Sequence, residues 1–549
     1  MPATSQTEIE LKFLVPQASR AALAIEMARK SATLERRTLA AMYLDTGDRR
    51  LARAGIAWRL RREGRRWIQT LKADGASAIE RFEHEVIRPG PVHDATVHAG
   101  TRAGDKLLGI LRDARDEGLE VGVRFQTDVR RISRRIRTRG AVVEVAFDEG
   151  RLLANGARAR IREVEFELVS GSASAMLALA ERWRKRFSLL FDPRSKAERG
   201  DRLARGSAFP PIRKARSPKY SDEANAIEAF AAVLDECLAH ISRNAVGLFD
   251  GDPALRVEHV HQLRVGIRRL RSALRSFEQW VPPAPQSLVD DLKSLFADMG
   301  RARDSDVLDS GVAAELDKVG APPLAMPAGE AGPDPAELIR ASAAQQTLLA
   351  WIAWRVGLAD GPEDAVTPVA APLPAGSGAS EDEEAKTVEG ESSGGADSAE
   401  GEAIFGEDVR AATETSLDDA RTFQREAARR LRRWHRKIAA DWKNFDQLEE
   451  EGLHSLRKRI KRQRYAVEFF APALRRRQTE RYLEPLTAIQ DRMGELNDLF
   501  VARGRYEALV ASDPAAWFAL GWLAARVAEV RLRARPELKQ LAKADPPGR

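Results

Sequence analysis

The sequence contains a single cysteine, Cys237, among its 549 residues. One cysteine cannot close a disulfide within the chain, and no second thiol stands at the spacing of a zinc site. Cys237 lies among apolar residues at helical spacing, which predicts a buried thiol without a chemical role. The sequence therefore gives no sign of a disulfide-stabilised or zinc-bound domain.

The chain also has no long apolar run and no apolar leader. Its longest apolar stretch, Ala515–Val530, contains Arg526 and Glu529 and is shorter than the ~20 apolar residues of a membrane-spanning helix. The first residues, MPATSQTEIELK, do not show the basic-then-apolar pattern of a secretory signal. We expect a cytoplasmic protein without a membrane partner.

Acidic and basic residues are unevenly distributed along the chain. The formal net charge is +7, but residues 381–408 carry eleven acidic residues and one lysine, which leaves +17 on the rest. A basic excess of this size favours an anionic partner, such as a phosphate polymer, nucleic acid or a membrane surface.

The length predicts two to four domains. Residues 1–205 show the short alternating runs of β-strands, and residues 222–537 show apolar residues at helical spacing. Residues 206–221, with three prolines, are the expected linker. Residues 361–408 contain almost no large apolar side chains, which predicts a disordered acidic insert in the helical domain. This insert is either a solvated tether or an internal competitor for anions.

Charged residues occupy alternate positions of several predicted strands. Successive side chains of a strand point to opposite faces, so Glu8, Glu10 and Lys12 share one face. Ile9 and Leu11 share the other face. The further charged residues in alternating runs are Arg59 and Arg61; Arg81, Glu83 and Glu85; Glu144 and Asp148; and Glu163, Glu165 and Glu167.

Two arrangements explain this alternation: an open sheet with one face in water, or a closed barrel lined by the charges. The signs of the charges favour the barrel. A solvated face usually mixes signs, whereas here some strands are acidic and others mainly basic, and like charges along one strand repel each other. Inside a barrel, such residues supply oxygen ligands for a divalent cation and positive charges for phosphate.

The first 200 residues or so resemble the CYTH superfamily, the triphosphate tunnel metalloenzymes. The resemblance begins with Glu8-x-Glu10-x-Lys12. The other matching segments, in order, are Tyr43–Thr46, Arg59 with Arg61, Thr70–Lys72, Arg81-x-Glu83-x-Glu85, Glu144 with Asp148-x-Gly150, 163–167, and Ser195-Lys196 with Arg199. The resemblance implies an α+β domain around an eight-stranded antiparallel β-barrel. Its tunnel is expected to bind triphosphate through Mg²⁺ or Mn²⁺.

The same resemblance implies a role for each charged residue. The implied metal ligands are Glu8 and Glu10, with two from the set Glu163, Glu165 and Glu167. The implied catalytic, phosphate-binding cations are Lys12, Arg59, Arg61, Lys72 and Lys196. The secondary tunnel candidates are Arg81, Glu83, Glu85, Arg131, Arg134, Glu144 and Asp148. For each acid, the alternative is an ion pair inside the barrel without a metal.

Two predicted helices, His261–Arg271 and His454–Arg464, repeat one basic pattern. Their cationic residues recur at offsets that fall on one helical face, and no acid interrupts either run. The residues on this face are His261, Arg264, Arg268 and Arg271 in the first copy and His454, Arg457, Lys461 and Arg464 in the second, with Arg269, Lys458 and Arg462 beside them. An ordinary solvated helix interleaves acids with bases, so this pattern predicts an anion-binding face. The two histidines could instead be capping or core groups.

These helices resemble the CHAD domain, which is named for its histidines and its α-helical fold. The resemblance implies an all-α region of two helical bundles related by a pseudo-twofold axis, with a surface that binds inorganic polyphosphate. CYTH and CHAD domains in one chain are most similar to bacterial inorganic triphosphatases, which predicts hydrolysis of triphosphate to pyrophosphate and phosphate.

Three other functions stay open at this point. The barrel could belong to an adenylyl cyclase or a thiamine triphosphatase, because both handle a triphosphate. The helical domain alone would suffice for a non-catalytic polyphosphate-binding protein. A nucleic-acid partner is disfavoured, because the basic stripes contain no interleaved aromatic residues for base stacking.

Overall fold

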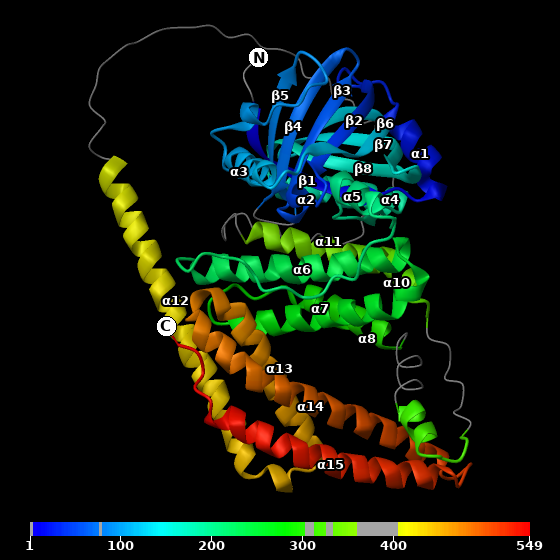
Figure 1. Ribbon diagram of the computed structural model, residues 1–549, viewed down its shortest axis with the longest axis vertical. Coiled ribbons are helices and arrows are strands. Elements are labelled where there is room, and N and C mark those ends of the chain that lie inside the picture. Colours follow the sequence, from blue (N-terminus) through cyan, green and yellow to red (C-terminus); the bar gives the residue numbers. More distant parts are fainter. Residues whose placement is uncertain (1–3, 76–78, 302–311, 325–332, 359–404, 549) are drawn as a thin grey trace.

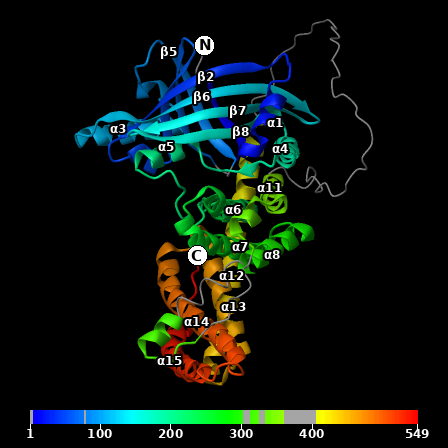
Figure 2. The ribbon, with the colours of Figure 1, turned by 90° about the vertical axis from the view of Figure 1, so that its right-hand side faces the viewer.

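The computed structural model of the protein describes residues 4–75, 79–301, 312–324, 333–358 and 405–548. Figures 1 and 2 show an N-terminal barrel stacked on the C-terminal helices. Helices α6 (Ala226–Asp250) and α11 (Ser342–Gly357) lie next to the barrel, and α14 (Arg476–Leu509) and α15 (Ala516–Lys543) lie farthest from it.

Eight long strands form one closed antiparallel sheet. The strands are β1 (Thr4–Leu14), β2 (Glu35–Thr46), β3 (Ile56–Glu63), β4 (Arg66–Asp74), β5 (Glu80–Arg88), β6 (Val121–Thr138), β7 (Ala141–Ala154) and β8 (Ala157–Gly171). Their order is β5-β4-β3-β2-β6-β7-β8-β1, and pairing of β5 with β1 closes the barrel. A two-residue strand, β9 (Leu190–Phe191), flanks β1. The predicted eight-stranded antiparallel barrel is confirmed.

One set of the barrel's apolar side chains points outward, beneath helices. Phe166 of β8 packs edge-on against Trp183 of α4 (Ala173–Phe187), and both belong to the largest core cluster. Trp58 of β3 packs in a second cluster with Leu107 of α3 (Arg102–Asp116). Burying the outer face under helices leaves the charged alternate positions to line the interior.

Helix α5 (Lys196–Ala204) packs at one end of the barrel interior. Leu203 lies in a small apolar cluster with Tyr43 and Phe125, whose rings stack 4.3 Å apart. A Cβ at Gly200 would lie 2.1 Å from the ring of Phe125, so a glycine is needed for this close approach.

The C-terminal region is helical. Besides α6 and α11 it contains α7 (Arg256–Phe277), α8 (Gln286–Arg301), α10 (Pro335–Arg340), α12 (Phe405–Lys443), α13 (Glu450–Phe470), α14 (Arg476–Leu509) and α15 (Ala516–Lys543). The two copies of the basic pattern lie on α7 and α13, and these helices pack against each other. The pseudo-twofold relation between two bundles stays a prediction.

The structure describes the whole predicted linker but only the last residues of the predicted acidic insert. The predicted linker, 206–221, has no helix or strand and runs between α5 and α6. The predicted acidic insert, 361–408, lies outside the described residues except for 405–408, which begin α12. Among the described helices, none is both long and apolar enough to cross a membrane.

Candidate active site

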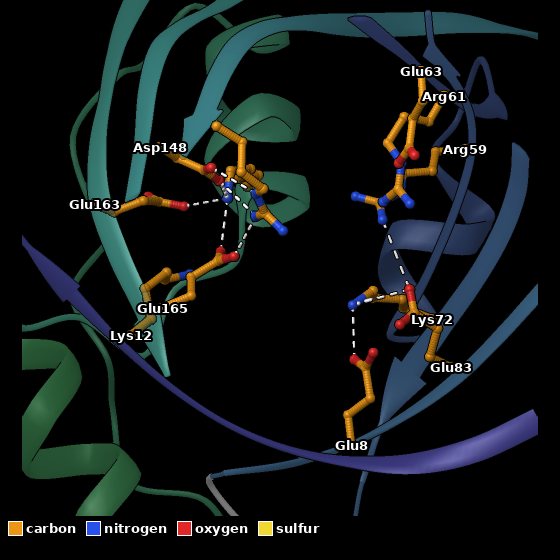
Figure 3. Close-up of polar contacts among 12 residues, drawn as sticks. Glu8, Lys12, Arg59, Arg61, Glu63, Lys72, Glu83, Asp148, Glu163 and Glu165 are labelled. Carbon is orange, nitrogen blue, oxygen red and sulfur yellow. Dashed lines mark hydrogen bonds and ion pairs between the residues drawn. The ribbon is translucent and has the colours of Figure 1, made fainter. Parts of the chain in front are cut away.

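A cavity of about 1310 Å³ runs through the barrel, and charged side chains line it. Its lining includes every predicted barrel residue except Glu163 and Arg134. Figure 3 shows two groups of these side chains on opposite walls, facing each other across open space. One group comes from β7, β8 and neighbouring segments, and the other from β1, β3, β4 and β5.

The first group surrounds the ammonium of Lys196, the first residue of α5. Lys196 Nζ lies 2.7 Å from Asp148 Oδ2, 2.6 Å from Glu163 Oε1 and 2.7 Å from Glu165 Oε1. Burial alone would lower the pKa of Lys196, but the three carboxylates hold that pKa well above its usual value. Lys196 is therefore charged at neutral pH.

Arg131 completes the first group from β6. Its guanidinium forms two hydrogen bonds with the Asp148 carboxylate, both of 2.7 Å, and lies 2.5 Å from Glu165. Burial would raise the pKa of Asp148, but Arg131 and Lys196 lower it below its ordinary value. Asp148 and Glu165 are thus ionised, with protein cations beside them.

The second group surrounds Lys72 of β4. Lys72 Nζ lies 2.8 Å from Glu8 and 3.1 Å from Glu83, and Arg59 lies 3.7 Å from Glu83. Arg61 pairs with Glu85 at 3.2 Å. Burial and a hydrogen bond with Glu83 raise the pKa of Glu8. Despite its burial, Glu83 has a lowered pKa because Lys72 and Arg59 stabilise its carboxylate.

A third set of acids lies on adjacent strands between these groups. Glu167 of β8 pairs in register with Glu10 of β1 on one side and with Glu144 of β7 on the other. Burial raises the pKa of Glu167 to about 7, and Glu144, Glu83 and Glu10 add to the rise. We call Glu10, Glu144 and Glu167 the acidic strip.

Two sets of carboxylates in the tunnel offer donors for a divalent cation, since carboxylate oxygens are the ligands that Mg²⁺ and Mn²⁺ take in proteins. The acidic strip is brought together by strand register, and burial raises the pKa of Glu167 there. In the first group, Asp148, Glu163 and Glu165 have oxygens within 4.8 Å of one another. The ammonium of Lys196 already lies among those oxygens.

The predicted anion-binding face of the helical domain gathers where α7 meets α13. Arg268 of α7 and Arg457 of α13 both act on Lys461, and burial together with these two guanidiniums lowers the pKa of Lys461 to about 7. Arg464 is partly engaged, since it lies 2.6 Å from Glu468 and from Gln490. His454, Lys458 and Arg271 are exposed.

Family models match both parts of the chain. A model of the CYTH domain matches residues 6–200, and a model of the CHAD domain matches residues 232–507, which is half of the chain. The protein belongs to the CHAD family and carries an N-terminal CYTH domain. The domain resemblances predicted from the sequence are thereby confirmed.

The aligned region shared with a curated relative covers only part of this CYTH–CHAD chain. An inorganic triphosphatase from Haemophilus influenzae is 28% identical over 202 residues, which are 35% of this chain and 54% of the relative. The chain thus spans about half the length of that curated relative.

Two solved structures are also similar. The CHAD domain from the plant Ricinus communis is 26% identical, with 61% of this chain and 98% of that chain covered and a TM-score of 0.36. A putative adenylyl cyclase from Hippeastrum, described as having a dominant triphosphatase activity, is 19% identical. That match covers 37% of this chain and 98% of the other, with a TM-score of 0.27.

Arg134 and Arg269 of the CYTH–CHAD protein do not lie at the sites that were predicted for them. Arg134 lies on the outer face of the barrel, 2.9 Å from Glu26 and over the ring of Trp183. It lies three positions after Arg131 in the same strand, so the two side chains point to opposite faces. Arg269, predicted beside the anion-binding face, is 3% exposed and paired with Glu468.

The carboxylate of Glu163 is surrounded by cations of the protein. It is fully buried and lies 2.6 Å from Lys196 and 2.7 Å from Arg199. Its carboxylate belongs to an ion-pair cluster, the alternative that the sequence left open for each acid. Arg81 lies at the cavity wall and donates a 3.2 Å hydrogen bond to the Pro193 carbonyl.

Sequence reasoning missed several polar residues of the CYTH tunnel. Glu63 lines the cavity and lies 2.7 Å from Arg61; it continues the alternation of Arg59 and Arg61, so the same rule could have found it. Asp192 and Arg194 lie beside Lys12, in a segment without a periodic pattern. The ammonium of Lys12 donates to the Arg194 carbonyl, and Arg194 holds Asp192 through two hydrogen bonds of 2.9 and 2.8 Å.

Proposed function

We propose that the tunnel hydrolyses inorganic triphosphate to pyrophosphate and phosphate, with a divalent metal ion. The observation that carries the proposal is the pair of cationic groups on opposite walls of one cavity. Arg59, Arg61 and Lys72 lie on one wall, and Lys12, Arg131 and Lys196 on the other. A triphosphate between the walls places its non-bridging oxygens within reach of positive charge from both sides.

The protein side chains do most of their work by binding and charge stabilisation. Negative charge spreads over the oxygens of the transferred phosphoryl group in the transition state, so fixed guanidinium and ammonium groups stabilise it. Their own carboxylate partners, such as Asp148 and Glu83, hold them in place before substrate arrives. A carboxylate of the tunnel orients the attacking water and accepts its proton.

The acidic strip, together with Glu8, would hold Mg²⁺ or Mn²⁺. When bound, the ion neutralises phosphate oxygens and adds to the charge stabilisation. This ligand set keeps Glu8, Glu10 and Glu167 of the sequence-based expectation and adds Glu144. Lys196 and Arg131 engage Glu163 and Glu165, as Lys72 engages Glu8.

The cavity wall favours an inorganic substrate over a nucleotide or thiamine triphosphate. Adenine and thiamine need an accessible aromatic or apolar surface beside the phosphates. The aromatic residues that line the described cavity are Tyr43, Trp58 and Phe125, and each is at most 5% exposed. Tyr43 and Phe125 also stack on each other, which occupies one ring face of each.

A substrate panel tests this proposal. Purified protein is incubated with tripolyphosphate, ATP or thiamine triphosphate, each with Mg²⁺ or Mn²⁺, and the released phosphate and pyrophosphate are measured. We expect tripolyphosphate to have the highest kcat/KM. Glu10→Gln should lose activity, whereas Asp116→Asn, an exposed position at the end of α3, should not. Preference for ATP with release of pyrophosphate alone would favour the cyclase.

We further propose that the helical domain binds inorganic polyphosphate where α7 meets α13. Burial and the guanidiniums of Arg457 and Arg268 lower the pKa of Lys461, and a polyanion relieves the repulsion among these three cations. Binding of long-chain polyphosphate should weaken in the double variant Arg268→Gln/Lys461→Gln, measured by calorimetry at fixed salt. Equal affinity for DNA at the same salt concentration would instead favour a general polyanion binder.

A further inference from the structure

The tunnel cavity does not end at the barrel. Its lining continues from α5 onto the segment 210–219, between the two domains, and onto α6. Pockets of about 300–1,000 Å³ hold drug-sized ligands, so a cavity of about 1310 Å³ has room for far more than one triphosphate. The part of the cavity outside the barrel thus has room for a ligand that extends beyond a triphosphate.

Several acids line this outer part, and four of them form an ion pair with a protein cation. Glu236 lies 2.6 Å from Arg213, Asp201 lies 2.6 Å from Arg49, and Asp235 lies 2.8 Å from Arg355. Glu198 pairs with Arg243, which links α5 to α6. These pairs cancel within the wall and contribute little net charge.

Three further cations of the outer wall have no such partner. Lys214, Arg216 and Lys219 line the cavity, are exposed, and form no ion pair with any described residue. We call these three residues the basic ledge. Arg205, at the end of α5, lines the same cavity and is exposed as well. The ledge and Arg205 thus present positive charge in this outer part, where Asp74 and Glu80 also line the cavity.

The ledge is held in place by contacts with the helical domain. At its start, the backbone N–H of Arg213 donates to Asn244 of α6, and that of Arg216 donates 2.8 Å to Glu236. The Arg216 carbonyl accepts from Arg269 of α7 at 3.2 Å, and the Tyr220 hydroxyl donates 2.8 Å to the Phe469 carbonyl of α13. The ledge thus leads from the tunnel mouth towards the helices that carry the basic repeats.

We propose that the basic ledge binds the phosphates of a linear polyphosphate chain whose end lies in the tunnel. The substrate class of the site is then linear inorganic polyphosphate longer than triphosphate. The inference rests on the proposed triphosphatase function of the same tunnel. The three ledge cations recognise non-bridging phosphate oxygens, which repeat along such a chain and are absent beyond the third phosphorus of tripolyphosphate.

The test compares two substrates and two variants of the full chain. The ledge variant is Lys214→Gln/Arg216→Gln/Lys219→Gln. The matched control, Arg137→Gln/Arg139→Gln/Arg158→Gln, removes the same charge from exposed sites on the β6–β7 and β7–β8 hairpins, which do not line the cavity. Initial rates with tripolyphosphate and with long-chain polyphosphate give the ratio of their kcat/KM values. Unfolding curves check that all three proteins are folded.

We expect the ratio, long chain over tripolyphosphate, to fall about tenfold in the ledge variant, because three exposed phosphate contacts are lost. The control should keep the wild-type ratio, and added salt should lower the wild-type ratio towards that of the ledge variant. The single variant Lys219→Gln should show a smaller fall in the same direction.

Three outcomes overturn the inference. An unchanged ratio in the ledge variant, or an equal fall in the control, excludes a local contact at the ledge. Hydrolysis of tripolyphosphate without any hydrolysis of the longer chain excludes the ledge as a substrate site but leaves the triphosphatase function standing. Folded wild-type protein that hydrolyses neither substrate overturns the proposed function and the ledge together.

Discussion

Asp250, the last residue of α6, lies 2.6 Å from the guanidinium of Arg194, and this contact joins the helical domain to the tunnel. Arg194 also holds the buried carboxylate of Asp192, and its carbonyl accepts from Lys12 inside the tunnel. Burial lowers the pKa of Lys12, while Glu163 and Asp192 oppose that change. The position of a tunnel lysine thus depends on a residue of the helical domain.

The first prediction concerns this contact. Asp250→Asn should lower kcat for tripolyphosphate by about two- to fivefold, because Arg194 is then held less firmly beside Lys12. The loss of unfolding free energy should stay at or below ~1 kcal/mol, since the Asp250 side chain is 45% exposed. Steady-state kinetics and denaturant unfolding measure both. Asp116→Asn is the control. Equal kinetics in the two variants would contradict an effect of Asp250 on the tunnel.

The second prediction separates a metal ligand from an ion-pair partner. Glu167→Gln should raise the Mn²⁺ concentration needed for half-maximal activity, because the acidic strip loses a donor oxygen. Its stability without metal should not fall, since Glu167 is pushed towards protonation by burial and neighbouring acids. Glu163→Gln should instead mainly destabilise the fold. Activity is measured as Mn²⁺ is added back to chelator-treated protein of each variant. A larger rise of the half-maximal Mn²⁺ concentration in Glu163→Gln than in Glu167→Gln would contradict the assignment of Glu167 as the metal ligand.

The third prediction concerns Lys196. Lys196→Met should lower the free energy of unfolding by ~3–5 kcal/mol, because three buried carboxylates lose a shared cation. Adding Glu163→Gln should restore part of that loss, since one negative charge is removed from the same cluster. Lys185→Met, at an exposed site on α4, should change little. Denaturant unfolding at neutral pH measures all four proteins. No rescue by the second substitution would argue against repulsion as the cause.

The fourth prediction uses a buried histidine pair under α3. His84 Nδ1 and His98 Nδ1 lie 2.7 Å apart, and His98 Nε2 lies 2.9 Å from Gln69. Burial lowers the pKa of His98 to about 4, so the unfolded chain binds a proton there at a higher pH than the folded protein. The contribution of His98 to the free energy of unfolding is therefore fully present above about pH 6.5. It is lost as the pH drops towards 4, which lowers the free energy of unfolding by up to ~3 kcal/mol.

The variant His98→Gln should flatten this pH dependence. Its side chain keeps a polar partner for Gln69 but does not titrate in this range. Unfolding free energies of the wild type and the variant, measured from pH 7 to pH 4, give the two slopes. Parallel slopes would show that other groups cause the acid sensitivity.

Strand alternation predicted most of the tunnel lining because it is a local property of the backbone. Glu8, Glu10 and Lys12 could be assigned to one face from their spacing alone, and all three line the cavity. The same rule, applied strictly, would have rejected Arg134, which differs in parity from Arg131. The closed barrel followed from the signs of the charges, since a like-charged polar face needs partners from other strands.

Contacts between distant segments could not be predicted in this way. Lys196 comes to lie among Asp148, Glu163 and Glu165 only because α5 packs at the end of the barrel. These acids share the alternating pattern of Glu167, so the pattern alone did not show which of them pairs with a protein cation. The Asp192–Arg194–Asp250 contacts join segments with no shared periodicity. Arg269 likewise pairs with Glu468 across two helices nearly 200 residues apart.

The most direct test of the central claim is the rate of phosphate release from tripolyphosphate with Mn²⁺, compared between the wild type and Lys72→Met. Lys72 lines the cavity opposite Asp148 and Glu165, which hold Lys196, so its loss removes charge at the substrate itself. We predict rapid release by the wild type and a fall of about 10²- to 10³-fold in kcat for the variant. Folded wild-type protein that releases no phosphate, or a variant that retains the full rate, would contradict the account.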